Sequence, residues 1–177
     1  MIDAVRAGGI DGSTVLEIGG GVGALQLELL RSGAARAVSV ELSAEWERAA
    51  SELARELELE DRIERRLADA VVGADSLPPA DVVVMNRVVC CYPDPDALMA
   101  VASERARSVL VVSFPRDRAL VRLVNRGANV WMALRRIDFR SFVHPEQRIE
   151  EAARRHGLRP GSDHRMFAWR AVAFVRE

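Results

Sequence analysis

The sequence contains no lysine, so all 25 of its basic side chains are arginine. The 26 acidic side chains almost balance them and leave a formal net charge of −1. A chain that is nearly neutral creates no global field that attracts nucleic acid or an acidic surface, so we expect no nucleic-acid partner. A local cluster of arginines can still bind a phosphate or a carboxylate.

Long apolar runs and a targeting segment are also lacking. No run approaches the roughly 18 apolar residues of a membrane span, and the amino-terminal sequence MIDAVRAGGIDG has no apolar core of a secretory signal. The only cysteines, Cys90 and Cys91, are adjacent, and neighbouring cysteines seldom pair, while two soft ligands do not make a zinc site. We therefore expect no metal, no membrane and a cytoplasmic location.

What the sequence does contain is a regular alternation of two patterns over a length that suits one domain, residues 1–177. Short β-like runs cover 14–18, 35–42, 61–69, 80–86 and 108–115, and helical runs cover 24–33, 43–59, 94–106 and 145–157. Strands separated by helices predict parallel pairing with right-handed crossovers. Two consecutive strands, at 158–165 and 166–177, predict an antiparallel pair at one edge.

The segment 116–139 breaks this alternation. It is mostly helical in pattern, with an interruption at Gly127, and it is longer than an ordinary crossover. We expect a helical lid over the site, with Gly127 as its hinge.

Four glycines lie between the first strand and the first helix, in TVLEIGGGVGALQLELL. A turn of this kind lets the backbone approach a ligand, because no Cβ stands in the way. The spacing of Gly19, Gly21 and Gly23, followed by Ala24, is also compatible with the dinucleotide fingerprint. The glycines alone predict a nucleotide-like ligand without deciding which one.

One acid lies near the end of each of three successive strands, and these acids help to distinguish a dinucleotide from another nucleotide-like ligand. Glu17 lies two residues before the loop, where a carboxylate would repel a pyrophosphate and attract a cationic ligand. Glu41 ends the second strand, where it can accept hydrogen bonds from ribose hydroxyls, and Asp69 ends the third, where it can accept one from an adenine amino group. Together they predict an adenosine that carries a positively charged amino acid.

At these residues the sequence resembles the class I S-adenosylmethionine-dependent methyltransferases, in LEIGGGVG, SVEL, LADA and ADVVVMNRVVCCYP. The resemblance implies an α/β fold with a Rossmann-like, seven-stranded, mostly parallel sheet in the order 3-2-1-4-5-7-6, with the last strand antiparallel and helices on both faces. RVVCCYPD, SFPRDR and FVHP further resemble a bacterial group related to the magnesium-protoporphyrin O-methyltransferases. The porphyrin substrate is not implied for this chain.

The resemblance also implies how S-adenosylmethionine would be held at the glycine turn. Gly19, Gly21 and Gly23 are expected around its methionine part. Glu17 is expected to hold the loop or to meet the ammonium group through water.

The other cofactor contacts follow from the next three strand ends. Glu41 is expected to bind the ribose hydroxyls, with Leu42 against the adenine face. Asp69 is expected to take the adenine amino group, and the backbone N–H of Ala70 a ring nitrogen. Asn86 is expected near the amino-acid end.

Four residues are candidates for the acceptor side. His144 precedes Pro145 at a helix start and could deprotonate a hydroxyl, although the same position suits a helix cap. Tyr92, the only tyrosine, could orient the substrate or line the pocket. Arg116 and Arg87 could bind an acidic group of the substrate.

The expected function is methyl transfer from S-adenosylmethionine to a small molecule, at oxygen. A domain that binds the cofactor without turnover is the alternative, and an NAD(P)-dependent oxidoreductase is disfavoured by Glu17 and Asp69 and by the lack of a Tyr-x-x-x-Lys pair. Family members carry further helices before the first strand, where this sequence has a short segment. We therefore expect a more open site, or one covered by a second subunit of a homodimer.

Overall fold

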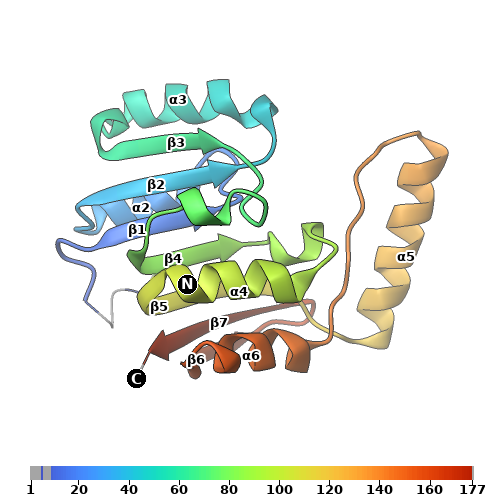
Figure 1. Cartoon of the computed structure of the whole chain (residues 1–177). Coiled ribbons are helices and arrows are strands. Elements are labelled where there is room, and N and C mark those ends of the chain that lie inside the picture. The colour runs from blue at the N-terminus through green and yellow to red at the C-terminus, as the bar shows by residue number, and fades with distance from the viewer. Residues whose placement is uncertain (1–4, 6–8, 177) are drawn as a thin grey trace.

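Seven strands form one sheet in the computed structural model, which describes Val5 and residues 9–176. Their order across the sheet is β3-β2-β1-β4-β5-β7-β6, as the family resemblance implies (Figure 1). The strands are β1 (Thr14–Ile18), β2 (Arg36–Glu41), β3 (Ile63–Leu67), β4 (Ala80–Asn86), β5 (Ala106–Pro115), β6 (Leu158–Arg165) and β7 (Trp169–Arg176).

The strand directions confirm the prediction of a mostly parallel sheet with an antiparallel last strand. Strands β1 to β5 pair in parallel, whereas β7 is antiparallel to both β5 and β6. The last strand begins later than predicted, because residues 166–168 form the turn between β6 and β7, closed by Met166 N–H to Trp169 O at 2.8 Å. Glu177, at the end of the predicted strand, lies outside the described residues. Residues 1–4 and 6–8, on which the prediction about a secretory signal falls, also lie outside them.

The continuous apolar run of β4 explains why this strand lies in the middle of the sheet. Val83 and Met85 pack into the core on one face, and Val82 and Val84 pack into the core on the other. A strand that is buried on both faces needs apolar residues at every position, which is the pattern of ADVVVMN.

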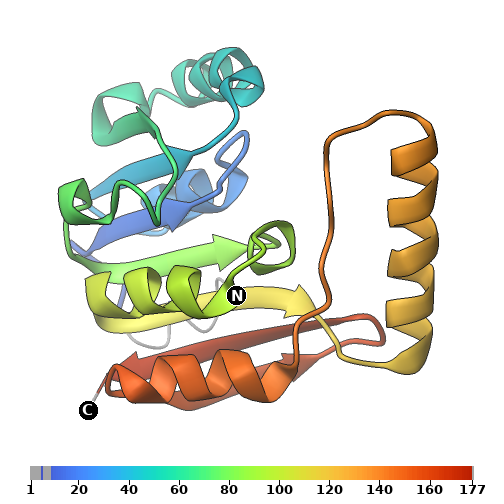
Figure 2. The same cartoon turned by 45° about the vertical axis from the view of Figure 1, so that its right-hand side comes forward.

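Helices cover both faces, as predicted (Figures 1 and 2). Helix α2 (Ala24–Arg31) and helix α3 (Glu47–Glu56) contribute to one core, and helix α4 (Pro95–Arg105) and helix α6 (Glu146–Arg155) contribute to the other. Ser43 caps the short 3₁₀ turn at 44–46 that leads into α3, because its hydroxyl accepts a hydrogen bond from Glu45 N–H at 3.3 Å.

Helix α5 (Ala119–Leu134) stands apart from these layers, beyond the edge where the parallel strands end (Figures 1 and 2). It runs without a break through Gly127, so the predicted interruption is wrong. Residues 135–143 return beside the helix toward α6. The hinge and the lid at 116–139 stay predictions. No helix in the described part of the chain is long and apolar enough to cross a membrane.

Candidate cofactor and acceptor site

A cavity of about 640 Å³ opens at the carboxyl ends of β1, β2, β3 and β4. This is the place where the sheet changes winding direction and where open α/β sheets bind their ligands. Eight of the predicted site residues line it: Gly19, Gly21, Glu41, Leu42, Asp69, Ala70, Arg87 and Tyr92. The five others, Glu17, Gly23, Asn86, Arg116 and His144, are not part of its wall.

The glycine loop forms the wall next to β1. Gly19, Gly21 and Gly23 all have positive φ angles, of 65°, 56° and 81°, which L side chains rarely adopt. At Gly19 a Cβ would also lie 2.5 Å from Cγ2 of Val88. The loop can therefore take this path only with glycine, and its backbone is open to the cavity.

Glu17 lies beneath this loop and is almost fully buried. A Cβ on Gly20 would lie 2.7 Å from its carboxylate, and Gln26 N–H donates to its Oε2 at 3.3 Å. Burial raises the pKa of Glu17 to about 7, while the Gln26 hydrogen bond and the charge of Arg65 act in the opposite direction. These contacts fix the carboxyl group beneath the loop, and both predicted roles of Glu17 stay predictions.

Glu41 connects the end of β2 to the glycine loop. Its Oε2 accepts a hydrogen bond from Gly21 N–H at 2.8 Å, and its Oε1 accepts one from Ser43 N–H at 2.9 Å. Both oxygens keep a free lone-pair direction, since a carboxylate oxygen accepts two hydrogen bonds. The backbone thus fixes the carboxylate in the cavity wall with capacity left for two hydroxyl donors.

Asp69 is fixed in a similar way at the end of β3. Its Oδ1 accepts hydrogen bonds from Val71 N–H at 2.8 Å and Val72 N–H at 3.2 Å. The Tyr92 hydroxyl donates to both oxygens of Asp69, at 3.1 and 3.2 Å. Tyr92 therefore extends toward the carboxylate expected to bind adenine.

At the end of β4, Arg87 reaches the cavity and Asn86 does not. Arg87 adopts a left-handed conformation, with φ of 61°, and its backbone N–H donates to Ser113 Oγ at 2.9 Å. Ser113 in turn donates to Asn86 Oδ1 at 2.7 Å. The Arg87 guanidinium lies 4.8 Å from the ring centre of Trp169, a cation–π contact that fixes the end of this side chain.

His144 lies behind the cavity wall, with 9% of its surface exposed. Its Nε2 lies 3.0 Å from the carbonyl oxygen of Tyr92 and must donate, because a carbonyl can only accept. The imidazole also stacks on Phe142, and burial lowers its pKa below the ordinary value. In this position the ring anchors the segment that carries Tyr92.

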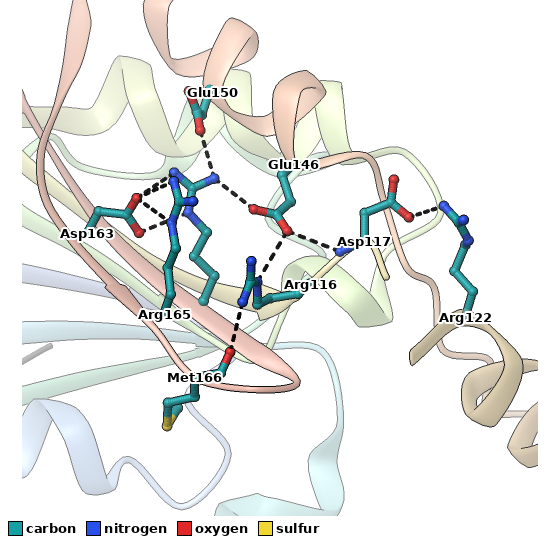
Figure 3. A network of polar contacts seen from close by, with 9 residues as sticks. Arg116, Asp117, Arg122, Glu146, Glu150, Asp163, Arg165 and Met166 are labelled. Atoms are coloured by element: carbon teal, nitrogen blue, oxygen red, sulfur yellow. Dashed lines mark hydrogen bonds and ion pairs between the residues drawn. The ribbon is translucent and has the colours of Figure 1, made fainter. Parts of the chain in front are cut away.

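Arg116 follows the end of β5 and belongs to a network of charges in which Arg170 pairs with Asp163, Glu146 and Glu150. Figure 3 shows Arg116 beside Glu146 in this network. Arg116 lies 3.7 Å from Glu146 Oε1 and donates to the carbonyl oxygen of Met166 at 3.3 Å. Glu146 also accepts from Arg170, at 3.0 Å. The role of Arg116 in substrate binding stays a prediction, but its charge already has a partner within the fold.

Sequence reasoning did not identify the aromatic side chains of Trp46 and Phe139 in this wall or the arginine that supports the glycine loop. Trp46 follows Ser43 and lies in the cavity wall, and 3.8 Å separates its ring from a Cβ placed on Gly21. Phe139 comes from the segment that returns from α5. Arg65 supports the loop from β3, donating to Gly21 O at 3.5 Å and to Glu47 at 3.1 Å.

Cys91 also lines the cavity, whereas Cys90 is buried in the core. Their sulfurs lie 3.7 Å apart, and both contact the carbonyl oxygen of Arg87. Among the described residues, no group of three His, Cys, Asp or Glu side chains could hold a metal ion.

Known proteins share this fold. Residues 4–161 match the family model of a methyltransferase domain, and no curated protein sequence matches the chain significantly. Magnesium protoporphyrin IX methyltransferase from Synechocystis PCC 6803, solved with S-adenosylhomocysteine, is similar with a TM-score of 0.78 and 20% identity, over 99% of this chain and 82% of that one.

Two further structures are similar over nearly all of this chain. An O-methyltransferase family protein from Burkholderia thailandensis has a TM-score of 0.77 and 18% identity, with all of this chain and 55% of that chain covered. Geranyl diphosphate C-methyltransferase from Streptomyces coelicolor A3(2) has a TM-score of 0.74 and 15% identity, with 99% and 76% covered. The chain therefore belongs to the methyltransferase domain family, and its fold is that of the class I S-adenosylmethionine-dependent methyltransferases.

Proposed function

We propose that this protein transfers a methyl group from S-adenosylmethionine to an oxygen of a small-molecule acceptor. The observation that carries the proposal is the pair of carboxylates, Glu41 and Asp69, fixed by backbone N–H groups in the wall of one cavity beside the glycine loop. Membership of the methyltransferase domain family gives the reaction class.

The residues present fit this cofactor. The volume of the cavity lies within the usual range of small-molecule sites, roughly 300 to 1,000 Å³. Glu41 keeps lone pairs for two ribose hydroxyls, and Asp69 can accept from an adenine amino group. Leu42, of which 65% is exposed, and Trp46 supply apolar surface for the adenine. A negative wall of this kind suits a sulfonium better than a pyrophosphate.

S-adenosylmethionine would supply a methyl group already activated by a sulfonium, and the protein's part is to align the two reactants and exclude water. The glycine loop and Glu41 would fix the nucleoside end. Arg87, fixed on Trp169, could hold an acidic group of the acceptor from the same cavity.

The names of the similar proteins support a small-molecule acceptor, but they do not agree on which atom of the acceptor is methylated. The Burkholderia protein is named as an O-methyltransferase, whereas the Streptomyces enzyme methylates carbon on geranyl diphosphate. A shared fold does not set the acceptor. The choice of oxygen therefore remains our proposal from the sequence resemblance.

For His144 and Tyr92 we propose roles in positioning the reactants. Because His144 Nε2 donates to Tyr92 O, that nitrogen is not free to take a proton in this conformation. The imidazole holds the segment on which Tyr92 faces the cavity. A role of His144 as general base would require this hydrogen bond to break.

The segment 116–139 is proposed as a lid, and Phe139 is its point of contact with the cavity. A cytoplasmic location, the lack of a nucleic-acid partner and a homodimer stay predictions from the sequence.

Calorimetry with S-adenosylmethionine, S-adenosylhomocysteine and NAD tests the proposal. We expect binding of the first two, none of NAD, and a loss of about tenfold or more in Glu41→Ala, since two hydrogen bonds to a charged group are removed. Glu52→Ala, on the exposed side of α3, is the matched control and should bind normally. Binding of NAD without binding of either sulfur compound would overturn the proposal.

A second measurement separates an enzyme from a domain that only binds the cofactor. Transfer of label from methyl-labelled S-adenosylmethionine to hydroxyl- or carboxyl-bearing acceptors is expected. Tight binding of S-adenosylhomocysteine without transfer to any acceptor, including carbon and nitrogen acceptors, would favour the binding domain instead.

A further inference from the structure

Helix α5 presents an apolar face that belongs to neither hydrophobic core of the described residues. This face, here called the arm face, follows the spacing of one side of a helix. Its members are Leu120, Leu123, Val124, Val130, Trp131 and Leu134, and more than half of each residue's surface is exposed. No residue of α5 is buried.

The opposite side of α5 provides the contacts that hold the helix in place. The side-chain amides of Asn125 and Asn129 donate to the carbonyl oxygen of Ser141, at 2.8 and 2.7 Å. Ser141 N–H donates back to Asn129 Oδ1 at 3.0 Å. The returning segment thus pairs with the polar side of the helix, and the arm face points away from it.

The segment that carries the arm face has charged side chains of one sign between Asp117 and Asp138. Between residues 118 and 137 the sequence carries five arginines, at 118, 122, 126, 135 and 136, and no acid. Of these five, only Arg122 has an acidic partner in the described residues, namely Asp117, which precedes the run. The chain as a whole has a net charge of −1, so this concentration of positive charge is local.

We propose that the arm face docks on an anionic lipid bilayer, with α5 lying in the plane of the interface. An apolar face with leucine, valine and tryptophan, with Arg126 and Arg135 at its two borders, is the pattern of interfacial helices. Each basic residue near an anionic leaflet adds to the attraction, and long arginine side chains can reach the headgroups while the apolar side chains enter the lipid.

Charge complementarity favours lipid over a second copy of this chain. Two arm faces packed together would bring Arg126 and Arg135 of each copy close to one another, within segments that contain no acid between residues 118 and 137. An anionic bilayer supplies the missing negative charge. This contact lies on the membrane surface and does not span it, and it revises the expectation from the sequence that no membrane takes part.

The test uses the full chain with lipid vesicles, one set of phosphatidylcholine alone and one with about one third phosphatidylglycerol. We expect flotation with the anionic vesicles only, and weaker binding when salt rises from about 0.1 to about 0.5 M. Leu134→Glu should weaken binding about tenfold or more, because a charge replaces a leucine that enters the lipid. Leu67→Glu, at an exposed site on β3, is the matched control and should bind like the wild type.

Fluorescence locates the contact. Of the three tryptophans, only Trp131 lies on the arm face, so the blue shift on vesicle addition should disappear in Trp131→Phe and persist in Trp169→Phe. Equal binding to both vesicle types, or equal loss in Leu134→Glu and Leu67→Glu, would overturn the proposal. So would a wild-type dimer in light scattering that becomes a monomer in Leu134→Glu without any vesicle binding, because a second copy would then cover the arm face. All these readouts are independent of cofactor binding and methyl transfer.

Discussion

The hydroxyl of Tyr92 donates to the carboxylate of Asp69, with distances of 3.1 and 3.2 Å to its two oxygens. The residue expected to orient the acceptor is therefore bonded to the residue expected to bind adenine. An adenine amino group that reaches Asp69 must share this carboxylate with Tyr92 or displace its hydroxyl.

Replacing the two partners should affect cofactor binding very differently. Tyr92→Phe removes only a competing donor, so we expect its affinity for S-adenosylhomocysteine to stay within about threefold of the wild type. Asp69→Ala removes the acceptor itself and should weaken binding about tenfold or more. Calorimetry measures both. Equal losses in the two variants would mean that the Tyr92 hydroxyl, and not a free carboxylate oxygen, supports the nucleoside.

Two glycines should respond to alanine in opposite ways. Gly19→Ala places a Cβ 2.5 Å from Val88 Cγ2 at a positive φ, so we expect a loss of about 1–3 kcal/mol in the free energy of unfolding, together with weaker cofactor binding. Gly127→Ala lies within α5 with no atom within 4 Å and should gain about 0.5–1 kcal/mol. Urea unfolding gives both values. A destabilised Gly127→Ala would indicate that α5 does need a flexible point there.

Glu17 should make the stability depend on pH. Its pKa of about 7 in the folded protein lies above the ordinary 4.5, so the folded state retains a proton that the unfolded state releases. Below pH 4.5 the Glu17 carboxyl is protonated in both the folded and the unfolded state, so its burial carries no penalty from ionisation. As pH rises from 4.5 to 7 the free energy of unfolding of the wild type falls, by at most about 3 kcal/mol. Glu17→Gln should lack this loss. Urea unfolding between about pH 5 and pH 8 checks it, and parallel pH curves for the two proteins would contradict it.

We expect His144 to contribute mainly through its hydrogen bond to Tyr92 O and not through proton transfer in the reaction. Glutamine can still donate to Tyr92 O, so His144→Gln should retain most of the turnover, whereas His144→Leu should lose about 1–3 kcal/mol of stability because that carbonyl loses its donor. The pH profile of turnover is the deciding measurement. Loss of the acid limb of this profile in His144→Gln, with the fold intact, would restore the role of general base, because protonation of a base at low pH produces that limb.

The Arg170 network gives a stability test away from the cavity. The Arg170 side chain is 4% exposed and pairs with Asp163, Glu146 and Glu150. Arg170→Met should cost about 3–5 kcal/mol, since it leaves these acids together without their cation. Arg165→Met, with half of its side chain exposed, should cost at most about 1 kcal/mol.

Acid titration gives a second readout of this network. Hydrogen bonds from Arg170, and less strongly from Arg165, lower the pKa of Asp163 to about 2. The stability contributed by this pair is present above the ordinary pKa of 3.8 and is lost as pH falls toward 2. The acid unfolding midpoint should therefore move to higher pH in Arg170→Met, and an unchanged midpoint would exclude Asp163 as a source of acid stability.

Local patterns were sufficient to predict the sheet and one side of the cavity. The acids at 41 and 69 end their strands at the same edge because parallel strands share one direction, so strand prediction alone brought them together. The continuous apolar run of β4 likewise identified a strand buried on both faces.

The acceptor side was harder to predict because its contacts come from segments far apart in the sequence. The partner of Arg116, Glu146, lies 30 positions away, and the partner of His144 is the carbonyl of Tyr92, which no side-chain pattern reveals. Trp46 reaches the cavity only because a 3₁₀ turn precedes α3. Gly127 has a helical neighbourhood on both sides, and that neighbourhood outweighed the low helix propensity of glycine.

The pairing of β6 with β7 has a consequence for how the chain is made. β6 is joined to the sheet only through β7, a strand that the ribosome produces after it. While the nascent chain ends before Trp169, β6 has no neighbour to receive its hydrogen bonds, and the outer edge of β5 is uncovered as well. This half of the sheet must therefore close late, after synthesis of β7, whereas the half that carries Glu41 and Asp69 can pair while translation continues.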